Sequence, residues 1–125
     1  MKDDWDDKLA ELESTLRAGD RDAALAQFLA FDAELARYVR GEERLLFPAL
    51  ERFTGVPARA TANMRKEHRS LRRLVDTIGE LIARRDRPRG LEVIANLRSV
   101  LLLHMAKEEW VLSPLLRPLQ AGSTS

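Results

Sequence analysis

The chain has 125 residues, of which 45% are hydrophobic and 33% are charged, and its formal net charge at pH 7 is +1. This length suits one domain with its own core, and the composition argues against a disordered chain and against a strongly basic nucleic-acid-binding protein. The sequence contains no cysteine, which excludes disulfides, thiol nucleophiles and iron–sulfur clusters. Any metal site must therefore use His, Asp, Glu or Tyr.

The first half of the chain predicts two helices. The first covers residues 4–18 and ends at Gly19-Asp20, where glycine stops one helix and aspartate caps the next. The second is long and ends near Phe53, before Thr54-Gly55-Val56-Pro57. Their apolar stripes repeat at helical spacing. The stripes contain Trp5, Leu9, Leu12 and Leu16, then Ala24, Phe28, Phe31, Leu35, Tyr38, Glu42, Leu46 and Ala49.

The second half predicts two further helices, separated by the Pro- and Gly-containing loop 84–90. Each apolar stripe includes one of the two histidines, His68 in the third helix and His104 in the fourth. Four amphipathic helices with short connections predict an all-α, up-down-up-down four-helix bundle. We expect the bundle to cover residues 1–119 and a disordered tail to cover 120–125.

A repeat of the form E-E-x-[LV]-L-x-P-x-L begins at Glu42 and again at Glu108. Four residues before these carboxylates lie Tyr38 and His104, so each helix presents an aromatic ring and a carboxylate on one face. His-x-x-x-Glu on a helix is a chelating pair. The prolines of the repeat predict a loosened turn, a helix end or a kink just beyond the carboxylates. They are Pro48 and Pro114.

Counting from the turns predicts which groups lie at the same depth. Glu42 is 13 residues before Gly55 and His68 is 13 after it. His68 and His104 are similarly placed about the next turn, level within about 3 Å at a rise of about 1.5 Å per residue. Glu42, His68, His104 and Glu108 should therefore converge inside the bundle. Two imidazoles and two carboxylates suit iron, manganese or zinc, and the alternative is a metal-free network in which the carboxylates pair with the histidines.

The first helix leaves a gap at this level. The position as far before the turn at Gly19 as Tyr38 is after it falls at the beginning of the chain, which has no histidine. The nearest side chains there are Met1, Lys2, Asp3 and Trp5. For Tyr38 three roles stay open: a phenolate ligand to a ferric ion, a redox-active or hydrogen-bonding group near bound oxygen, or a space-filler. Trp5 is expected to pack in the core.

On these residues the sequence resembles the hemerythrin-like (HHE cation-binding) family, whose members present His, His-x-x-x-Glu, His and His-x-x-x-Glu on four successive helices. The resemblance implies that Glu42 and Glu108 match the family's bridging carboxylates. It implies that His68 and His104 match the terminal imidazoles of one of two iron positions. Tyr38 and the Met1–Trp5 segment stand where the imidazoles of the other iron would be. The matching stretches are the Gly19-Asp20 junction and residues 42–48, 67–68 and 104–109.

The resemblance implies a metal-binding protein with iron as its cofactor. One ion is expected, with two as the alternative, and manganese or zinc is expected less than iron. Its role would lie in sensing dioxygen, nitric oxide or peroxide, or in iron handling. The near-neutral net charge and the lack of an apolar run of membrane-spanning length separately predict no nucleic-acid or membrane partner and a cytoplasmic location. Two rival interpretations stay open: a metal-free four-helix interaction module with a degenerate site, and a ferroxidase-like or peroxide-consuming centre. The sequence does not predict an oligomeric state.

Two further carboxylates, Glu43 and Glu109, lie one residue after the candidate ligands. Either could accept a hydrogen bond from an imidazole N–H group or face solvent, and we expect at least one of them to face solvent.

Overall fold

The computed structural model describes the backbone of residues 4–124 and the side chains of residues 4–110. Over this range the chain is helical except for three short connections at residues 18–20, 54–57 and 84–86. The elements are α1 (Asp4–Arg17), α2 (Arg21–Gly41), the π-helix η1 (Glu42–Leu46), α3 (Phe47–Phe53), α4 (Ala58–Ala83) and α5 (Arg87–Thr124). Met1, Lys2 and Asp3, which the sequence predicted to lie near the level of the converging side chains, are outside the described range.

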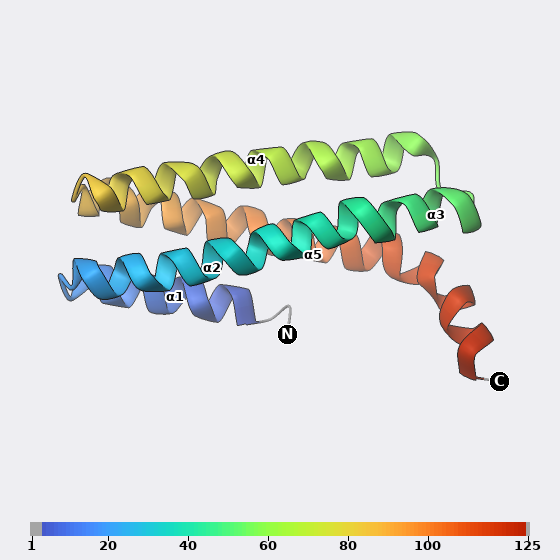
Figure 1. Cartoon of the computed structure of the whole chain (residues 1–125), viewed down its shortest axis with the longest axis horizontal. Helices are drawn as coiled ribbons and strands as arrows, with labels where there is room; N and C mark the ends of the chain where they lie inside the picture. Colours follow the sequence, from blue (N-terminus) through green and yellow to red (C-terminus); the bar gives the residue numbers. More distant parts are fainter. Residues whose placement is uncertain (1–3, 125) are drawn as a thin grey trace.

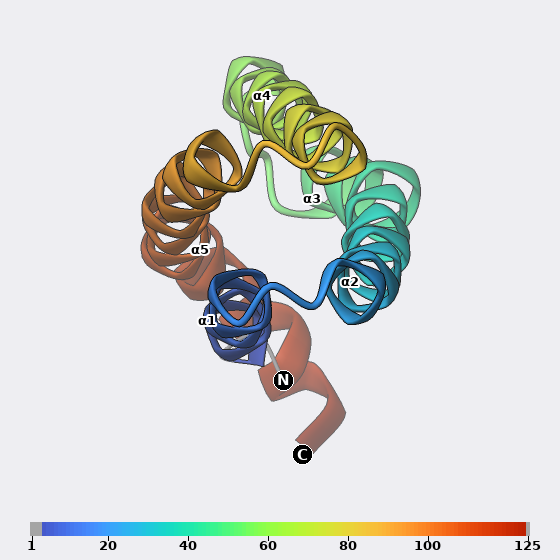
Figure 2. The same cartoon turned by 90° about the vertical axis from the view of Figure 1, so that its left-hand side faces the viewer.

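The helical segments form the predicted up-down-up-down bundle (Figure 1). Elements α2, η1 and α3 follow one another without a break and form a single long limb. Viewed along the bundle, α1 lies between α2 and α5, and α4 lies on the opposite side between the same two neighbours (Figure 2). The all-α fold class and the order of the four limbs are therefore confirmed.

The predicted apolar stripes form the core. Burial of one large aliphatic side chain contributes about 1.5–3 kcal/mol, so this set accounts for most of the cohesion between the limbs. Its buried members are Trp5, Leu9, Leu12, Leu16, Ala24, Phe28, Phe31, Leu35, Leu71, Val75, Ile78, Ile82, Ile94, Leu97 and Leu101. A second cluster of Phe47, Leu50, Val56 and Met64 closes the α3–α4 end.

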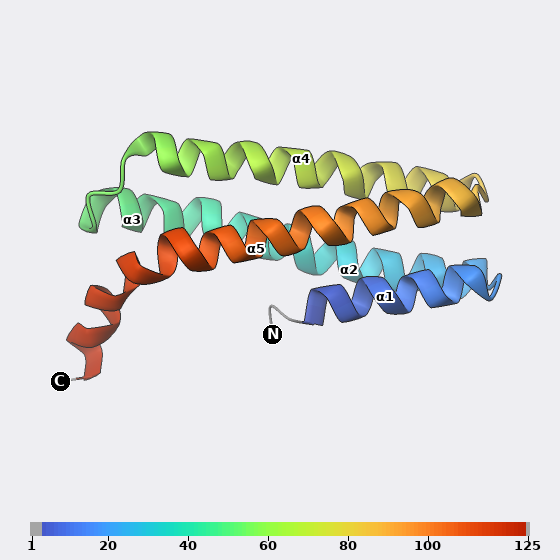
Figure 3. The same ribbon diagram turned by 180° about the vertical axis from the view of Figure 1, so that it is seen from behind.

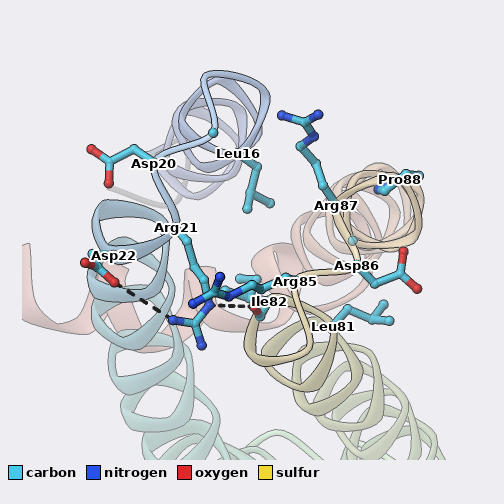
Figure 4. A pocket seen from close by; sticks show the side chains of 12 residues that line it. Leu16, Asp20, Arg21, Asp22, Leu81, Ile82, Arg85, Asp86, Arg87 and Pro88 are labelled. Carbon is cyan, nitrogen blue, oxygen red and sulfur yellow. Dashed lines mark hydrogen bonds and ion pairs between the residues drawn. The ribbon is translucent and has the colours of Figure 1, made fainter.

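Caps and cross-helix contacts secure the end of the bundle that holds the first and third connections. Gly19 adopts the left-handed φ of +82°, and the Asp20 carboxylate accepts a hydrogen bond from the backbone N–H of Ala23 at 3.1 Å, as the sequence predicted. Arg21 donates to the carbonyl oxygens of Ile82 and Ala83 at the end of α4, where the last carbonyls of a helix lack the usual i+4 donor. Figure 4 shows Arg21 and Ile82 beside a hollow of about 550 Å³ between the turns. None of the candidate metal ligands lines it.

A π-helical turn interrupts the long second limb where the repeat sequence lies. The backbone N–H of Phe47 donates to the carbonyl of Glu42, five residues earlier. Pro48 follows as the second residue of α3. Its ring would clash with the carbonyl four residues earlier in a regular α-helix, and the wider π turn relieves that clash. The loosened turn was predicted just beyond the carboxylates. It instead begins at Glu42 and includes Glu43.

The last limb bends at its end. The C-terminal part of α5, red in the figures, turns away from the bundle (Figures 1 and 3). The effect predicted for Pro114 stays a prediction. Helix α5 is assigned through Thr124, and the domain boundary at residue 119 with a disordered tail over 120–125 stays a prediction.

Helix α1 is the shortest of the four limbs, and its first turn lies beside the middle of the bundle rather than at its far end (Figure 3). An ion-pair cluster fastens it to α5. The Arg98 guanidinium bonds both oxygens of Asp6, at 2.8 and 2.9 Å, and also contacts the buried carboxylate of Glu13. Among the described residues, none of the helices combines the length and apolarity needed to span a membrane.

Replacing Arg98 should loosen α1. Arg98→Met keeps the aliphatic stem but leaves the buried Glu13 carboxylate without its partner, so we expect the free energy of unfolding to fall by about 1–3 kcal/mol. Urea unfolding followed by circular dichroism measures the change. Arg69→Met, on the exposed face of α4, is the control and should change stability by less than about 0.5 kcal/mol. Equal losses in both variants would contradict the assigned role.

Candidate metal centre

Four side chains meet in the interior at the level predicted by counting from the turns. Glu42 begins η1, His68 lies in the middle of α4, and His104 and Glu108 lie one turn apart on α5. All four are buried, with 3–6% of their surface exposed. One potential ligand atom from each lies within 4.8 Å of the others. Their convergence is thereby confirmed, while their role as metal ligands stays a prediction.

The atoms that face one another have no hydrogen-bond partners. His68 Nε2 lies 2.9 Å from Glu42 Oε1 and 4.0 Å from Glu108 Oε2, and His104 Nε2 contacts Glu108 Oε2. The His68–Glu42 and His104–Glu108 contacts are ion pairs when the rings are protonated, but they lack hydrogen-bond geometry, so each of the four buried atoms has no hydrogen-bond partner. Such atoms are costly unless something between them compensates. A divalent cation fits, because two carboxylates and two neutral imidazoles balance its charge and supply ligands that transition metals accept.

A second carboxylate holds the far side of each imidazole ring. His68 Nδ1 lies 2.7 Å from Glu43 Oε2, and His104 Nδ1 lies 3.2 Å from Glu67 Oε1. The other oxygen of Glu67 accepts a hydrogen bond from Lys107. When Nδ1 carries the proton and donates it to a carboxylate, the Nε2 lone pair is free to face the centre. Both histidines are therefore oriented as metal-binding histidines are.

Tyr38 lies on the opposite side of the two inner carboxylates. Its hydroxyl oxygen is 2.8 Å from Glu42 Oε2 and 2.7 Å from Glu108 Oε1. The ring is half-buried, and the edge-on ring of Trp5 packs against it with centroids 4.8 Å apart. Tyr38 thus contacts both carboxylates directly. Trp5 belongs to the core as expected, beside Tyr38 and Phe31.

Aromatic rings shield the α3–α4 side of the imidazoles. The ring of Phe47, fully buried, stacks on His68 with centroids 5.6 Å apart. The guanidinium of Arg65 lies over Phe47, 5.2 Å from its centroid. The two imidazole rings themselves are 5.1 Å apart. This enclosure keeps water away from the polar atoms at the centre and strengthens their electrostatic interactions.

The protonation of the metal-free centre follows from burial and from these contacts. Burial alone would lower the pKa of His68, but the surrounding carboxylates outweigh it and raise that pKa to about 10. The pKa of His104 is also raised, because its carboxylate neighbours outweigh burial. Burial raises the pKa of Glu42, whereas contacts with both imidazoles hold the pKa of Glu108 well below its usual range despite its burial. Burial and the adjacent carboxylates raise the pKa of Tyr38, so its phenol is neutral.

The surrounding carboxylates were predicted only in part. Glu43 contacts an imidazole and Glu109 is exposed, so the expectation that at least one of them faces solvent is confirmed. Glu67 was not identified as an imidazole partner, although it directly precedes His68 in the sequence. The sequence could have pointed to Glu67 on chemical grounds. Each metal-binding imidazole needs an acceptor for its second ring N–H, and carboxylates adjacent to the candidate ligands in the sequence can supply one.

A comparison with family models matches residues 4–116 to the one described as Hemerythrin HHE cation binding domain. The matched range includes all four limbs of the bundle and all four converging side chains. Searches of curated proteins and of solved structures gave no match.

The repeated Glu-Glu pair offers a matched test of the outer carboxylates. Glu43→Gln removes the charge that orients His68, so we expect the affinity for a divalent ion such as Zn²⁺ to fall about 10- to 100-fold. Glu109→Gln changes the corresponding residue of the repeat on the exposed face of α5 and should leave the affinity within about twofold. Titration calorimetry of the metal-free proteins measures both. A similar loss in the two variants would count against the assigned contact.

Metal binding should release protons. With a pKa of about 10, metal-free His68 carries a proton at pH 7, and a metal ion binds only the neutral ring. We expect at least one proton per bound ion, and an affinity that falls about tenfold per pH unit of acidification for each displaced proton. Calorimetry in buffers with different ionisation enthalpies measures the release. A binding enthalpy independent of the buffer would show that His68 is not protonated beforehand.

Proposed function

Because the chain belongs to the hemerythrin HHE cation-binding family, we propose that it binds iron through Glu42, His68, His104 and Glu108. We further propose that the bound iron serves in sensing dioxygen, nitric oxide or peroxide, or in iron handling. The observation that carries the proposal is the convergence of four buried atoms, one from each side chain, that have no hydrogen-bond partners. A cation placed among them would satisfy all four.

The same observation favours a metal over the metal-free alternative. A structural polar network would be expected to pair its buried donors with acceptors in good geometry. Here the outer ring nitrogens, Nδ1 of His68 and of His104, are hydrogen-bonded to carboxylates. The inner atoms lie at ion-pair distance but have no hydrogen-bond partners. This division, with satisfied outer atoms and unsatisfied inner ones, is the arrangement that metal-binding histidines require.

The donor set narrows the choice of ion. Imidazole nitrogen and carboxylate oxygen suit iron, manganese and zinc, and the lack of thiolate ligands disfavours soft ions such as Cu(I). Among these, iron agrees with a role that involves small oxidising ligands. When bound, iron would supply redox chemistry and an exchangeable coordination position. The protein's own residues hold the imidazoles in one orientation, exclude water, and keep a neutral phenol beside the carboxylates.

Anaerobic loading with ferrous iron tests the proposal. We expect stoichiometric iron in the wild-type protein after gel filtration, measured by plasma mass spectrometry, and a change in the visible spectrum when dioxygen, nitric oxide or peroxide is added. Removing one inner charge in Glu108→Gln should reduce iron binding by more than about tenfold. The neighbouring Glu109→Gln serves as the control.

The outcomes separate the competing interpretations. A wild-type protein that retains no iron would contradict the proposal and favour a metal-free interaction module. Many turnovers of ferrous iron or peroxide per chain would instead indicate the enzymatic alternative. A stoichiometric spectral response without turnover would support a sensing role.

A further inference from the structure

Each of the two inner carboxylates, Glu42 and Glu108, has one oxygen on the imidazole side of the centre and the other on the Tyr38 side. Glu42 Oε1 and Glu108 Oε2 face the imidazole nitrogens and have no hydrogen-bond partners. Glu42 Oε2 and Glu108 Oε1 face away from the imidazoles and meet the hydroxyl group of Tyr38. Each carboxylate therefore presents one oxygen to the proposed ion and the other oxygen to a phenol. The centre has two sides, and different residues face them.

The Tyr38 hydroxyl lies where a second ion would have to bind. An ion on that side would need the two outer carboxylate oxygens as ligands, at about 2.0–2.2 Å. The phenol oxygen already lies between the same two atoms, 2.8 and 2.7 Å away. An ion and a neutral hydroxyl cannot share this space. The hydroxyl proton can satisfy part of the negative charge that an ion would otherwise neutralise.

The surrounding packing holds Tyr38 in this place. The Trp5 ring lies against the side of Tyr38 that faces α1, and Trp5 is itself buried against Phe31. Helix α1 is fastened by the contact between Arg98 and Asp6. Within the described part of α1, residues 4–17, no imidazole or carboxylate joins the cluster. The side occupied by Tyr38 thus has no ligand of its own besides the shared carboxylates.

We propose that the Tyr38 hydroxyl takes the place of a second metal ion and thereby limits the centre to one ion per chain. This inference rests on the proposed metal-binding function. It goes further by stating how many ions the centre binds and which residue sets that number. Tyr38 acts as a positioning residue, because its hydroxyl lies within hydrogen-bond distance of Glu42 Oε2 and Glu108 Oε1 and can donate its one proton to either, which leaves Glu42 Oε1 and Glu108 Oε2 facing the imidazoles. It does not itself bind the metal.

Two substitutions separate the hydroxyl from the ring. Tyr38→Phe removes only the hydroxyl group, so the carboxylates lose their orienting donor while no new ligand appears. We expect one ion per chain, bound about 10- to 100-fold more weakly. Tyr38→His shortens the side chain and places a ring nitrogen near the carboxylates. An ion at about 2.0–2.1 Å from that nitrogen would lie close to the present hydroxyl position, so the count should rise above one toward two.

The experiment loads wild type and both variants with Fe²⁺ under anaerobic conditions, and separately with Zn²⁺, then counts bound ions and measures affinities. Two ions in the wild type, an unchanged count in Tyr38→His, or an unchanged affinity in Tyr38→Phe would overturn the inference. No bound ion in the wild type would overturn the proposed function as well, so the two failures are distinguishable. Melting temperatures of the metal-free proteins serve as the control. If Tyr38 only packs in the core, its substitution would lower the melting temperature without changing the number of bound ions or their affinity.

The ionisation state of Tyr38 gives an independent readout, because it is the only tyrosine in the chain. A neutral phenol that positions carboxylates should show no ultraviolet tyrosinate band after Zn²⁺ loading. It should also give no phenolate-to-iron absorption with ferric iron. The appearance of either band would show that Tyr38 is a metal ligand and would overturn the inference.

Discussion

The burial of two carboxylates against two imidazoles at the centre of a helical bundle is the constraint around which the other polar contacts of the interior are arranged. Glu42, Glu108, His68 and His104 are nearly inaccessible to solvent, and isolated charges in such a place are strongly unfavourable. The surrounding elements serve to compensate this cost. Outer carboxylates contact the far ring nitrogens and a phenol contacts the far carboxylate oxygens, whereas the inner atoms have no hydrogen-bond partners.

The π-helical turn links the backbone to this chemistry. Glu42 and Glu43, the first two residues of this turn, both contact His68, one at Nε2 and the other at Nδ1. Pro48 favours this wider turn because its ring cannot follow a regular one. A proline in the sequence repeat thereby contributes to the geometry of the site without touching it.

Stability and function occupy different parts of the bundle. The large apolar cluster joins all four limbs, whereas the polar centre lies beyond the start of α1 and draws its converging side chains from the other three limbs. The described part of α1 contributes packing through Trp5, and Arg98 secures that packing by its ion pairs with Asp6 and Glu13. The short first helix is therefore compatible with a stable fold although none of its described residues joins the converging group.

The sequence by itself determined the fold class, the four limbs, and the depth of the converging side chains. These follow from the fixed rise and periodicity of a helix, which are local properties. Only the tertiary structure decided which groups touch. Glu43 and Glu109 occupy the same place in the repeat, yet one meets an imidazole and the other faces solvent, because the neighbouring limbs present different side chains to them. Glu67 and the Tyr38 hydroxyl acquire their roles from side chains 37 and 70 residues away, and the rotation of one helix against another is set by the packing of the whole bundle.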